Sequence, residues 1–233
     1  ATLQTSAYTA VEPRLGVCGD TVMMVFADDD GTEGLNYQHL YYSLYDTDMG
    51  VWSQPKRVDD NDRCDLEYEL CSDGSRIWIA YTQLAPVTAE NQDQHEQLLS
   101  TVEVTAAVYD PDEDCFTDHA DLTLDQRFDT LPQLAVTDQG LCAAWVSNAT
   151  NDAFSQNANN SLYTALFTDG SWSAPTALTQ PGATVVSMDL GQLEGKTWLA
   201  TVRDVDCDLA TMEDRVVVLT DWNGATVTIP TEK

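Results

Sequence analysis

Basic residues are scarce in this sequence. The 233 residues include 10 Lys and Arg against 39 Asp and Glu, which gives a formal net charge of −29 at pH 7. A surface this negative repels phosphate groups, so we expect neither nucleic acid nor an anionic membrane surface as a partner. Much of the charge also has a plainer interpretation, because Asp is favoured in turns and net charge keeps proteins soluble.

Long hydrophobic runs are also absent. No segment approaches the roughly 18 apolar residues that cross a bilayer, so we expect no membrane insertion. The first residues show no basic region followed by an apolar core, as a signal peptide would. Because Ala1–Gln4 resembles the start of a processed chain, we expect a trimmed piece of a secreted parent, extracellular or at the cell surface. Further domains of that parent would then be additional partners.

The motifs of common metal sites and enzymes are missing. No Cys-x-x-Cys pair occurs and His39, His95 and His119 lie near no cysteine pair, which argues against structural zinc. No phosphate-binding loop, dinucleotide fingerprint, His-Glu-x-x-His or Gly-x-Ser-x-Gly is present. Cys142 lies in the apolar run Leu141–Val146, where we expect a buried free thiol.

The main positive feature is a fourfold repeat. Each unit has a first strand marked by a leucine, a short turn, a strongly apolar second strand, and then a third and a fourth strand. The marking leucines are Leu15, Leu70, Leu134 and Leu190. The second strands are predicted at Val22–Phe26, Ile77–Tyr81, Leu141–Val146 and Thr197–Val202. Only Thr88–Leu99 has a helical pattern.

Four antiparallel strands at this period are typical of a propeller blade. We therefore predict an all-β, propeller-like fold with four four-stranded antiparallel blades, either a small closed ring or part of a larger one. The predicted boundaries are a lead-in segment at 1–11 and blades at 12–60, 61–123, 124–180 and 181–233, which together form one propeller domain.

Two fourth strands begin with the same motif, Gly50-Val51-Trp52-Ser53-Gln54-Pro55 and Gly170-Ser171-Trp172-Ser173-Ala174-Pro175. This motif, just after an Asp-bearing turn, resembles the repeats of bacterial sialidase-like propellers, which carry an Asp-box of the form Ser-x-Asp-x-Gly-x-Thr-Trp there. The Asp-to-Trp spacing is shorter here, and units two and four lack the Trp. The resemblance implies the architecture of the whole chain rather than an activity.

Sialidases of this kind use an arginine triad to hold the substrate carboxylate, with a Tyr nucleophile backed by an acid. Their first arginine lies in Phe/Tyr-Arg-Ile-Pro, whereas this sequence has Glu12-Pro13-Arg14-Leu15. If an enzyme is present, Arg63, Arg127 and Arg203 are the arginines that would have to converge.

The connections between second and third strands are long in all four units, and the other turns within each unit are short. Because strands alternate in direction, these connections lie together on one face of the molecule, which we name the long-loop face. Loops of this length are usually functional or disordered. Their carboxylates, amides and aromatics suit sugar binding. The candidate ligand-binding residues are Asp28, Asp30, Tyr37, His95, Asn148, Phe154, Arg203 and Asp206.

Two acidic segments are candidates for a calcium site. Asp110–Asp114 and Asp28–Asp30 bring carboxylates together as a calcium loop does, but the sixth position after Asp110 is Cys115 rather than the Gly of an EF-hand. We expect a hairpin turn at Asp110–Asp114, no metal and no cofactor, with calcium as the alternative.

The leading hypothesis is a non-catalytic extracellular recognition module that binds a glycan or a protein through the long-loop face. One alternative is a sialidase-like or other glycoside hydrolase. A second alternative is a structural repeat region of a larger surface protein.

Overall fold

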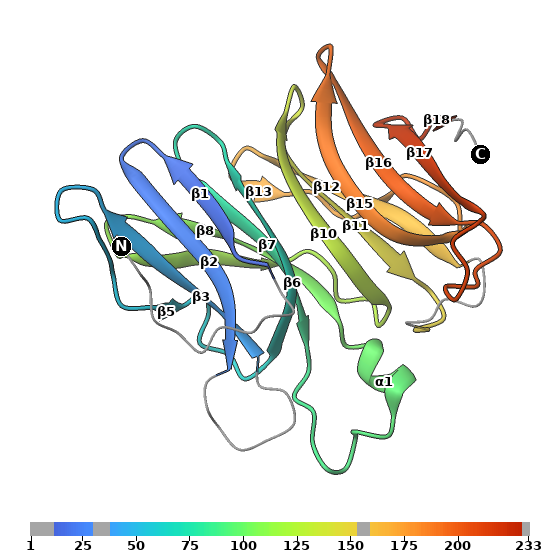
Figure 1. The fold of residues 1–233 in the computed structure, drawn as a ribbon, viewed down its shortest axis with the longest axis horizontal. Helices are drawn as coiled ribbons and strands as arrows, with labels where there is room; N and C mark the ends of the chain where they lie inside the picture. Colours follow the sequence, from blue (N-terminus) through green and yellow to red (C-terminus); the bar gives the residue numbers. More distant parts are fainter. Residues whose placement is uncertain (1–11, 30–37, 153–158, 230–233) are drawn as a thin grey trace.

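The computed structural model describes residues 12–29, 38–152 and 159–229, and the chain in it folds into four antiparallel sheets (Figure 1). The first sheet contains β1 (Arg14–Cys18), β2 (Thr21–Asp29), β3 (Gln38–Asp46), β4 (Val51–Trp52) and β5 (Lys56–Arg57). The second contains β6 (Cys64–Ser72), β7 (Ile77–Leu84), β8 (Glu103–Asp110) and β9 (Cys115–Asp121).

The third sheet contains β10 (Phe128–Thr137), β11 (Gly140–Asn148), β12 (Asn160–Thr168), β13 (Ser171–Trp172) and β14 (Thr176–Ala177). The fourth contains β15 (Thr184–Leu193), β16 (Lys196–Asp204), β17 (Arg215–Asp221) and β18 (Thr226–Ile229). Strands follow one another in chain order within each sheet, as in a propeller blade.

The predicted fold class is confirmed: the described chain is an all-β, propeller-like protein with four blades. The four leucines occupy the same place in each blade. They pair as Leu15 with Met24, Leu70 with Ile79, Leu134 with Ala143 and Leu190 with Leu199. The separation along the chain is identical in all four pairs, so positions in different blades can be compared through the strand register.

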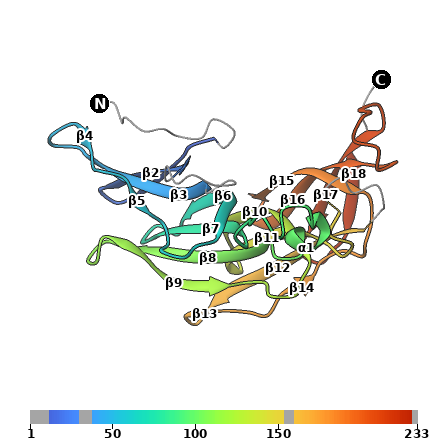
Figure 2. The same ribbon diagram turned by 90° about the horizontal axis from the view of Figure 1, so that it is seen from below.

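The inner strands β1, β6, β10 and β15 lie side by side in that order, and the first and fourth blades lie at opposite ends of the row (Figure 1). Seen from below, the blades form an open arc (Figure 2). The described strands therefore do not form a closed four-bladed ring.

The fourth strands of the first and third blades are interrupted, where the sequence predicts continuous strands. Pro55 and Pro175 have no N–H to donate to the ladder, so each strand is split in two. The preceding serine replaces the missing contacts: Ser53 donates its N–H to Leu44 O at 2.8 Å, and its Oγ accepts from Leu44 N at 3.0 Å. Ser173 makes the same pair of bonds to Leu166 in the third blade. The Ser and Pro of the Trp-Ser-x-Pro motif therefore determine where the fourth strand is interrupted.

Apolar side chains fill the space between neighbouring blades. Tyr42 and Leu40 of the first blade pack with Tyr68 and Ile79 of the second in one buried cluster. Trp145 of the third blade joins a cluster with residues of β8. Cys142 is fully buried, as predicted, with its Sγ 3.0 Å from Thr137 Oγ1, and burial raises the pKa of its thiol to about 11. No disulfide joins the six cysteines, all of which lie in the described residues.

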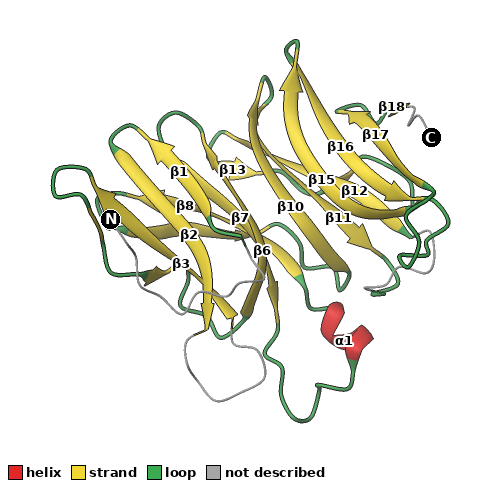
Figure 3. Cartoon of the chain, in the orientation of Figure 1, coloured by secondary structure: helices red, strands yellow, loops and turns green. Residues whose placement is uncertain are grey.

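The long-loop face can be followed in the described part of the chain. The long connection between β7 and β8 lies at the bottom of Figure 1, and the described ends of β2, β11 and β16 lie toward the same end of their blades. The one helix among the described residues, α1 (His95–Leu99), lies in the connection of the second blade (Figure 3) and is shorter than the predicted Thr88–Leu99. No helix among the described residues is long and apolar enough to cross a membrane.

Candidate functional site

The candidate residues from the sequence do not assemble into one site. Asp28 ends β2 in the first blade, His95 begins α1 in the second, and Asn148 ends β11 in the third. Arg203 and Asp206 belong to the fourth blade, while Asp30, Tyr37 and Phe154 lie outside the described residues. Spread over four blades, the five described side chains do not line a common pocket.

Several of these side chains hold their own loops. Asn148 is buried, and its Oδ1 accepts from the N–H and hydroxyl of Thr150, both at 2.9 Å. The Asp206 carboxylate accepts a hydrogen bond from the N–H of Asp208 at 2.9 Å. The backbone N–H of Asp206 donates to the Asp214 carboxylate at 2.7 Å. These contacts stabilise loop conformations, which explains why amides and carboxylates are frequent there.

The three arginines of the enzyme hypothesis also serve separate blades. Arg63 donates to the carbonyls of Gln83 and Thr101 and so braces the long connection of the second blade. Arg127 donates to the hydroxyl of Tyr163 in β12 at 3.0 Å. Arg203 bonds threonines of its own sheet, and burial lowers the pKa of its guanidinium. A triad formed by these three is not supported.

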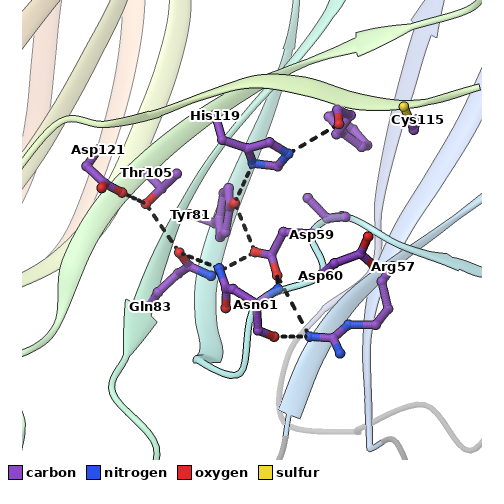
Figure 4. Close-up of a pocket in the computed structure, with 12 residues that line it drawn as sticks. Arg57, Asp59, Asp60, Asn61, Tyr81, Gln83, Thr105, Cys115, His119 and Asp121 are labelled. Atoms are coloured by element: carbon purple, nitrogen blue, oxygen red, sulfur yellow. Dashed lines mark hydrogen bonds and ion pairs between the residues drawn. The ribbon is translucent and has the colours of Figure 1, made fainter. Parts of the chain in front are cut away.

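A pocket of about 530 Å³ lies between the first and second blades, and we name it the inter-blade pocket (Figure 4). It runs from the link between the two blades along β9. The lining residues are Arg57, Val58, Asp59, Asp60, Asn61, Tyr81, Gln83, Thr105, Cys115, Phe116, His119 and Asp121. Most are hydrogen-bonding side chains, whereas Val58 and Phe116 form a buried apolar part.

Asp59 is the centre of the hydrogen bonds in this pocket. Its Oδ2 accepts from the Tyr81 hydroxyl at 3.0 Å and from Gln83 Nε2 at 2.7 Å. The Tyr81 hydroxyl also lies 3.1 Å from His119 Nδ1, so it connects the inter-blade link with β9. Burial, reinforced by Asp59, raises the pKa of Tyr81 far above its usual range, which keeps the phenol protonated.

A second carboxylate lies beneath this layer. Asp65 is buried and accepts from Leu40 N at 2.8 Å and from Gln83 Nε2 at 2.9 Å. Burial, followed by repulsion from Asp59, raises the pKa of Asp65 to about 7. Arg57 lies near both carboxylates, and its guanidinium bonds His39 Nδ1 at 2.8 Å and Asn61 O at 2.7 Å.

The accessible edge of the pocket is formed by Asp60, His119 and Asp121, which are exposed. The deeper groups are fixed by one another before any ligand arrives, and such preorganisation lowers the entropic cost of binding. Their chemistry suits hydroxyl groups, which can both donate to carboxylates and accept from amides and guanidinium.

A second cavity of about 400 Å³ lies along the inner strands, and we name it the axial cleft. Its side chains come from β1, β6, β10 and β15, three of which carry a register shift at this level, a feature frequent beside active sites. The lining residues are Glu12, Arg14, Leu66, Glu67, Tyr68, Glu69, Leu131, Pro132, Gln133, Ser187 and Met188.

Carboxylates are present in the axial cleft but are already engaged. Glu67 Oε2 accepts from Thr130 Oγ1 and from Leu131 N, both at 2.6 Å, and so ties β6 to β10. Leu131 has φ of 53°, a left-handed conformation that this clamp helps to hold. Glu69 lies 3.6 Å from Arg14, and burial raises its pKa. The cleft is thus built around braced strands.

The sequence directed attention to the long connections, whereas both cavities are formed by strands and inter-blade links. The signal in the sequence is a polar residue at the end of an apolar strand, such as Gln83 in β7. Its contact with Asp59 depends on how the link from the first blade packs against the second blade.

Comparisons with known proteins agree with the fold. No protein-family model and no curated protein sequence matches the chain. Among solved structures, the chain is similar to a Hadza microbial sialidase, with a TM-score of 0.65 and 12% identity over 93% of this chain and 45% of that one. A Trypanosoma rangeli sialidase in complex with sialic acid has a TM-score of 0.58, with 11% identity over 93% and 36% of the two chains.

An exo-1,5-alpha-L-arabinanase from a bovine ruminal metagenomic library has a TM-score of 0.52, with 9% identity over 95% of this chain and 78% of that one. The chain spans less than half the length of the two sialidases. At these identities the similarity shows the fold alone. The resemblance to sialidase-like propellers expected from the Trp-Ser-x-Pro motif is confirmed at the level of architecture.

Proposed function

We propose that this protein is a non-catalytic recognition module that binds a neutral glycan in the inter-blade pocket. The observation that carries the proposal is the hydrogen-bonded set of Asp59, Tyr81 and Gln83 beside the apolar surface of Val58 and Phe116. Sugars present hydroxyls on their edges and C–H groups on their faces, so a pocket with both kinds of wall matches them. An extracellular location is part of the proposal.

The charge of the pocket favours a neutral sugar over an acidic one. Asp59, Asp60 and Asp121 line it together with a single arginine, Arg57. The Arg57 guanidinium already bonds Asn61 O and His39 and lies 3.8 Å from Asp59. A ligand carboxylate would have to compete with Asn61 O and His39 for the single guanidinium, and three carboxylates would repel it.

The side chains in the pocket that could act as acid or base, Asp59 and His119, are already hydrogen-bonded within the protein, which favours binding over catalysis. Glycoside hydrolysis needs one carboxyl group that can give a proton and a second that can attack or activate water. Asp59 accepts two internal hydrogen bonds, and His119 has one nitrogen against Tyr81 and the other 3.2 Å from Phe116 O. Groups held in this way orient a ligand.

A glycan-array screen followed by calorimetry tests this proposal. We expect a neutral glycan to bind, and we expect His119→Ala and Asp121→Asn, at the exposed edge of the pocket, to weaken binding about tenfold. Asp169→Asn, in an exposed turn of the third blade, serves as the matched control and should bind like the wild type. Absence of binding to every glycan by a folded protein, or equal binding by all three variants, would contradict the proposal.

The alternative of a glycoside-acting enzyme has one observation in its favour, the cluster of Glu12, Glu67, Glu69 and Arg14 in the axial cleft. If the chain hydrolyses glycosides there, a panel of aryl glycosides should reveal turnover that Glu69→Gln abolishes without loss of folding. Turnover that survives in His119→Ala but not in Glu69→Gln would assign the activity to the cleft.

A further inference from the structure

The junction between the second and third blades contains three carboxylates whose ligand atoms lie within 4.8 Å of one another. Glu103 begins β8, Asp125 lies in the link between the blades, and Asp129 is the second residue of β10. They meet at the long-loop face, where β8 and β10 begin. Glu103 and Asp129 are buried, with 5% and 0% of their surfaces exposed.

Three of the four buried carboxylate oxygens lack a hydrogen-bond partner. Neither oxygen of Asp129 has a hydrogen-bond partner, and Glu103 Oε2 has none. Burial raises the pKa of Asp129, and the nearby Ser147 and Thr123 hydroxyls offset this only in part, because neither makes a well-formed hydrogen bond to it. Burial of unpaired charges costs several kcal/mol per ion, so native proteins pair them or place them around metals.

In the equivalent junction between the first and second blades, the buried carboxylate has hydrogen-bond partners. By the strand register, Asp129 corresponds to Asp65, whose oxygens accept from Leu40 N and from the Gln83 side chain. In the next junction, Val104 occupies the place of Leu40, but its N–H donates to Thr123 Oγ1 at 2.8 Å. Ser147 takes the place of Gln83, and its Oγ is itself without a partner.

The junction around Asp129 also carries more negative charge than the junction around Asp65. Around Asp65 the register places His39 and Arg57, which bond each other at 2.8 Å. The corresponding register positions in the next junction hold Glu103 and Asp121, so an imidazole and a guanidinium are replaced by two carboxyl groups. Arg127 is 3.6 Å from Asp125, and no Lys or Arg pairs with Glu103 or Asp129 among the described ion pairs.

We propose that Glu103, Asp125 and Asp129 bind a calcium ion that fastens the second blade to the third. The ligands are all hard oxygen donors, with no His or Cys in the cluster, which suits calcium rather than zinc. Three carboxylates that bind through one or two oxygens each, with the Ser147 hydroxyl and water, can supply the six to eight oxygens that calcium takes. Asp110–Asp114 and Asp28–Asp30 are not part of this site.

The bound ion would hold the long connection that ends at Glu103. That connection contains α1 and is already linked to the site because Asp129 N donates to Val102 O at 3.3 Å. Calcium would therefore link the connection before β8, the link before β10 and the start of β10 itself. This role does not depend on glycan binding in the inter-blade pocket.

Calorimetric titration of the EGTA-treated full chain with calcium chloride at about 0.15 M salt, which screens diffuse attraction to the acidic surface, tests the site. We expect one saturable calcium per chain and a rise of several degrees in Tm. Asp129→Asn and Glu103→Gln should each weaken binding about tenfold or more, whereas Asp112→Asn in the β8–β9 turn should bind like the wild type. Magnesium should bind less tightly, because it demands a strict octahedron and sheds water reluctantly.

Stability without metal separates a binding role from a purely structural one. In EGTA, Asp129→Asn should be at least as stable as the wild type, because it removes a buried unpaired charge, and it should lose the stabilisation by calcium. Absence of a saturable site in the folded wild type, or calcium affinity unchanged in both Asp129→Asn and Glu103→Gln, would overturn the proposal. Equal affinity for magnesium would overturn the choice of calcium.

Discussion

The indole of Trp172 lies edge-on to that of Trp78, with ring centroids 6.2 Å apart and an interplanar angle of 89°. Trp172 belongs to β13 in the third blade and Trp78 to β7 in the second, so this contact joins two blades. Phe167 completes the group, at 4.7 Å from Trp78 and 5.4 Å from Trp172. The copy of the motif in the first blade differs: the ring contact described for Trp52 is with Tyr45 of its own hairpin.

The two copies of the motif should therefore differ in their contribution to stability. We expect Trp172→Ala to lower the free energy of unfolding by about 3 kcal/mol or more, because it leaves a cavity between two blades. Trp52→Ala should cost about 1 to 2 kcal/mol less. Urea unfolding followed by far-ultraviolet circular dichroism measures both. Equal losses would show that the contact across the junction contributes little.

Stability should decrease as the pH rises from about 4 to about 7. Burial places the pKa of Asp65 at about 7 in the folded protein, above the value of 3.8 for an ordinary aspartate. In this window the folded state binds more protons than the unfolded state, so the free energy of unfolding falls with pH and then levels off. Unfolding in EGTA at pH 4.5, 6 and 8 should show a weaker decrease for Asp65→Asn than for the wild type or Asp112→Asn. Identical slopes would contradict the burial argument.

Glu67 should stabilise the fold by holding two inner strands together. Its Oε2 accepts from Thr130 Oγ1 and Leu131 N, and hydrogen bonds to a charged group contribute about 1.5 to 3 kcal/mol each. We expect Glu67→Ala, which removes both bonds, to lower the free energy of unfolding by about 3 kcal/mol or more. Glu90→Ala, at an exposed position before α1, is the matched control and should change it by about 0.5 kcal/mol or less. Similar small effects of both would show that the clamp is dispensable.

The chain should not hydrolyse sialosides. Arg63, Arg127 and Arg203 bond groups in three separate blades, so they do not form a clamp for a sugar carboxylate. A fluorogenic sialoside is expected to show no turnover above the buffer rate at pH 5 to 8. Turnover that is abolished by Arg14→Ala would place a carboxylate clamp in the axial cleft and contradict the separation of recognition from catalysis.

Much of the fold could be predicted because a repeated strand pattern is a local property. Apolar runs such as Leu141–Val146 become second strands, and the leucine before each marks a common register. The serine of Trp-Ser-x-Pro, however, bonds its neighbouring strand to replace contacts that the following proline cannot make. The interruption of the fourth strand depends on that pairing, so the strand pattern alone does not predict it.

The candidate sites were harder to predict, because long loops indicate a face but not which side chains meet on it. Asn148 is buried and holds its own loop, although its residue type suggested sugar binding. Asp59 and His119 come from different blades and approach each other only through Tyr81.

The sequence by itself determined the strands, the four blades and the face that bears the long connections, since each follows from periodicity and turn chemistry. The tertiary structure decided which polar groups share a cavity and which carboxylates remain unpaired. Asp65 and Asp129 are the same residue at the same place in the repeat. One is satisfied by Leu40 and Gln83, and the other faces Glu103 and Asp125, because their neighbours across the blade junction differ.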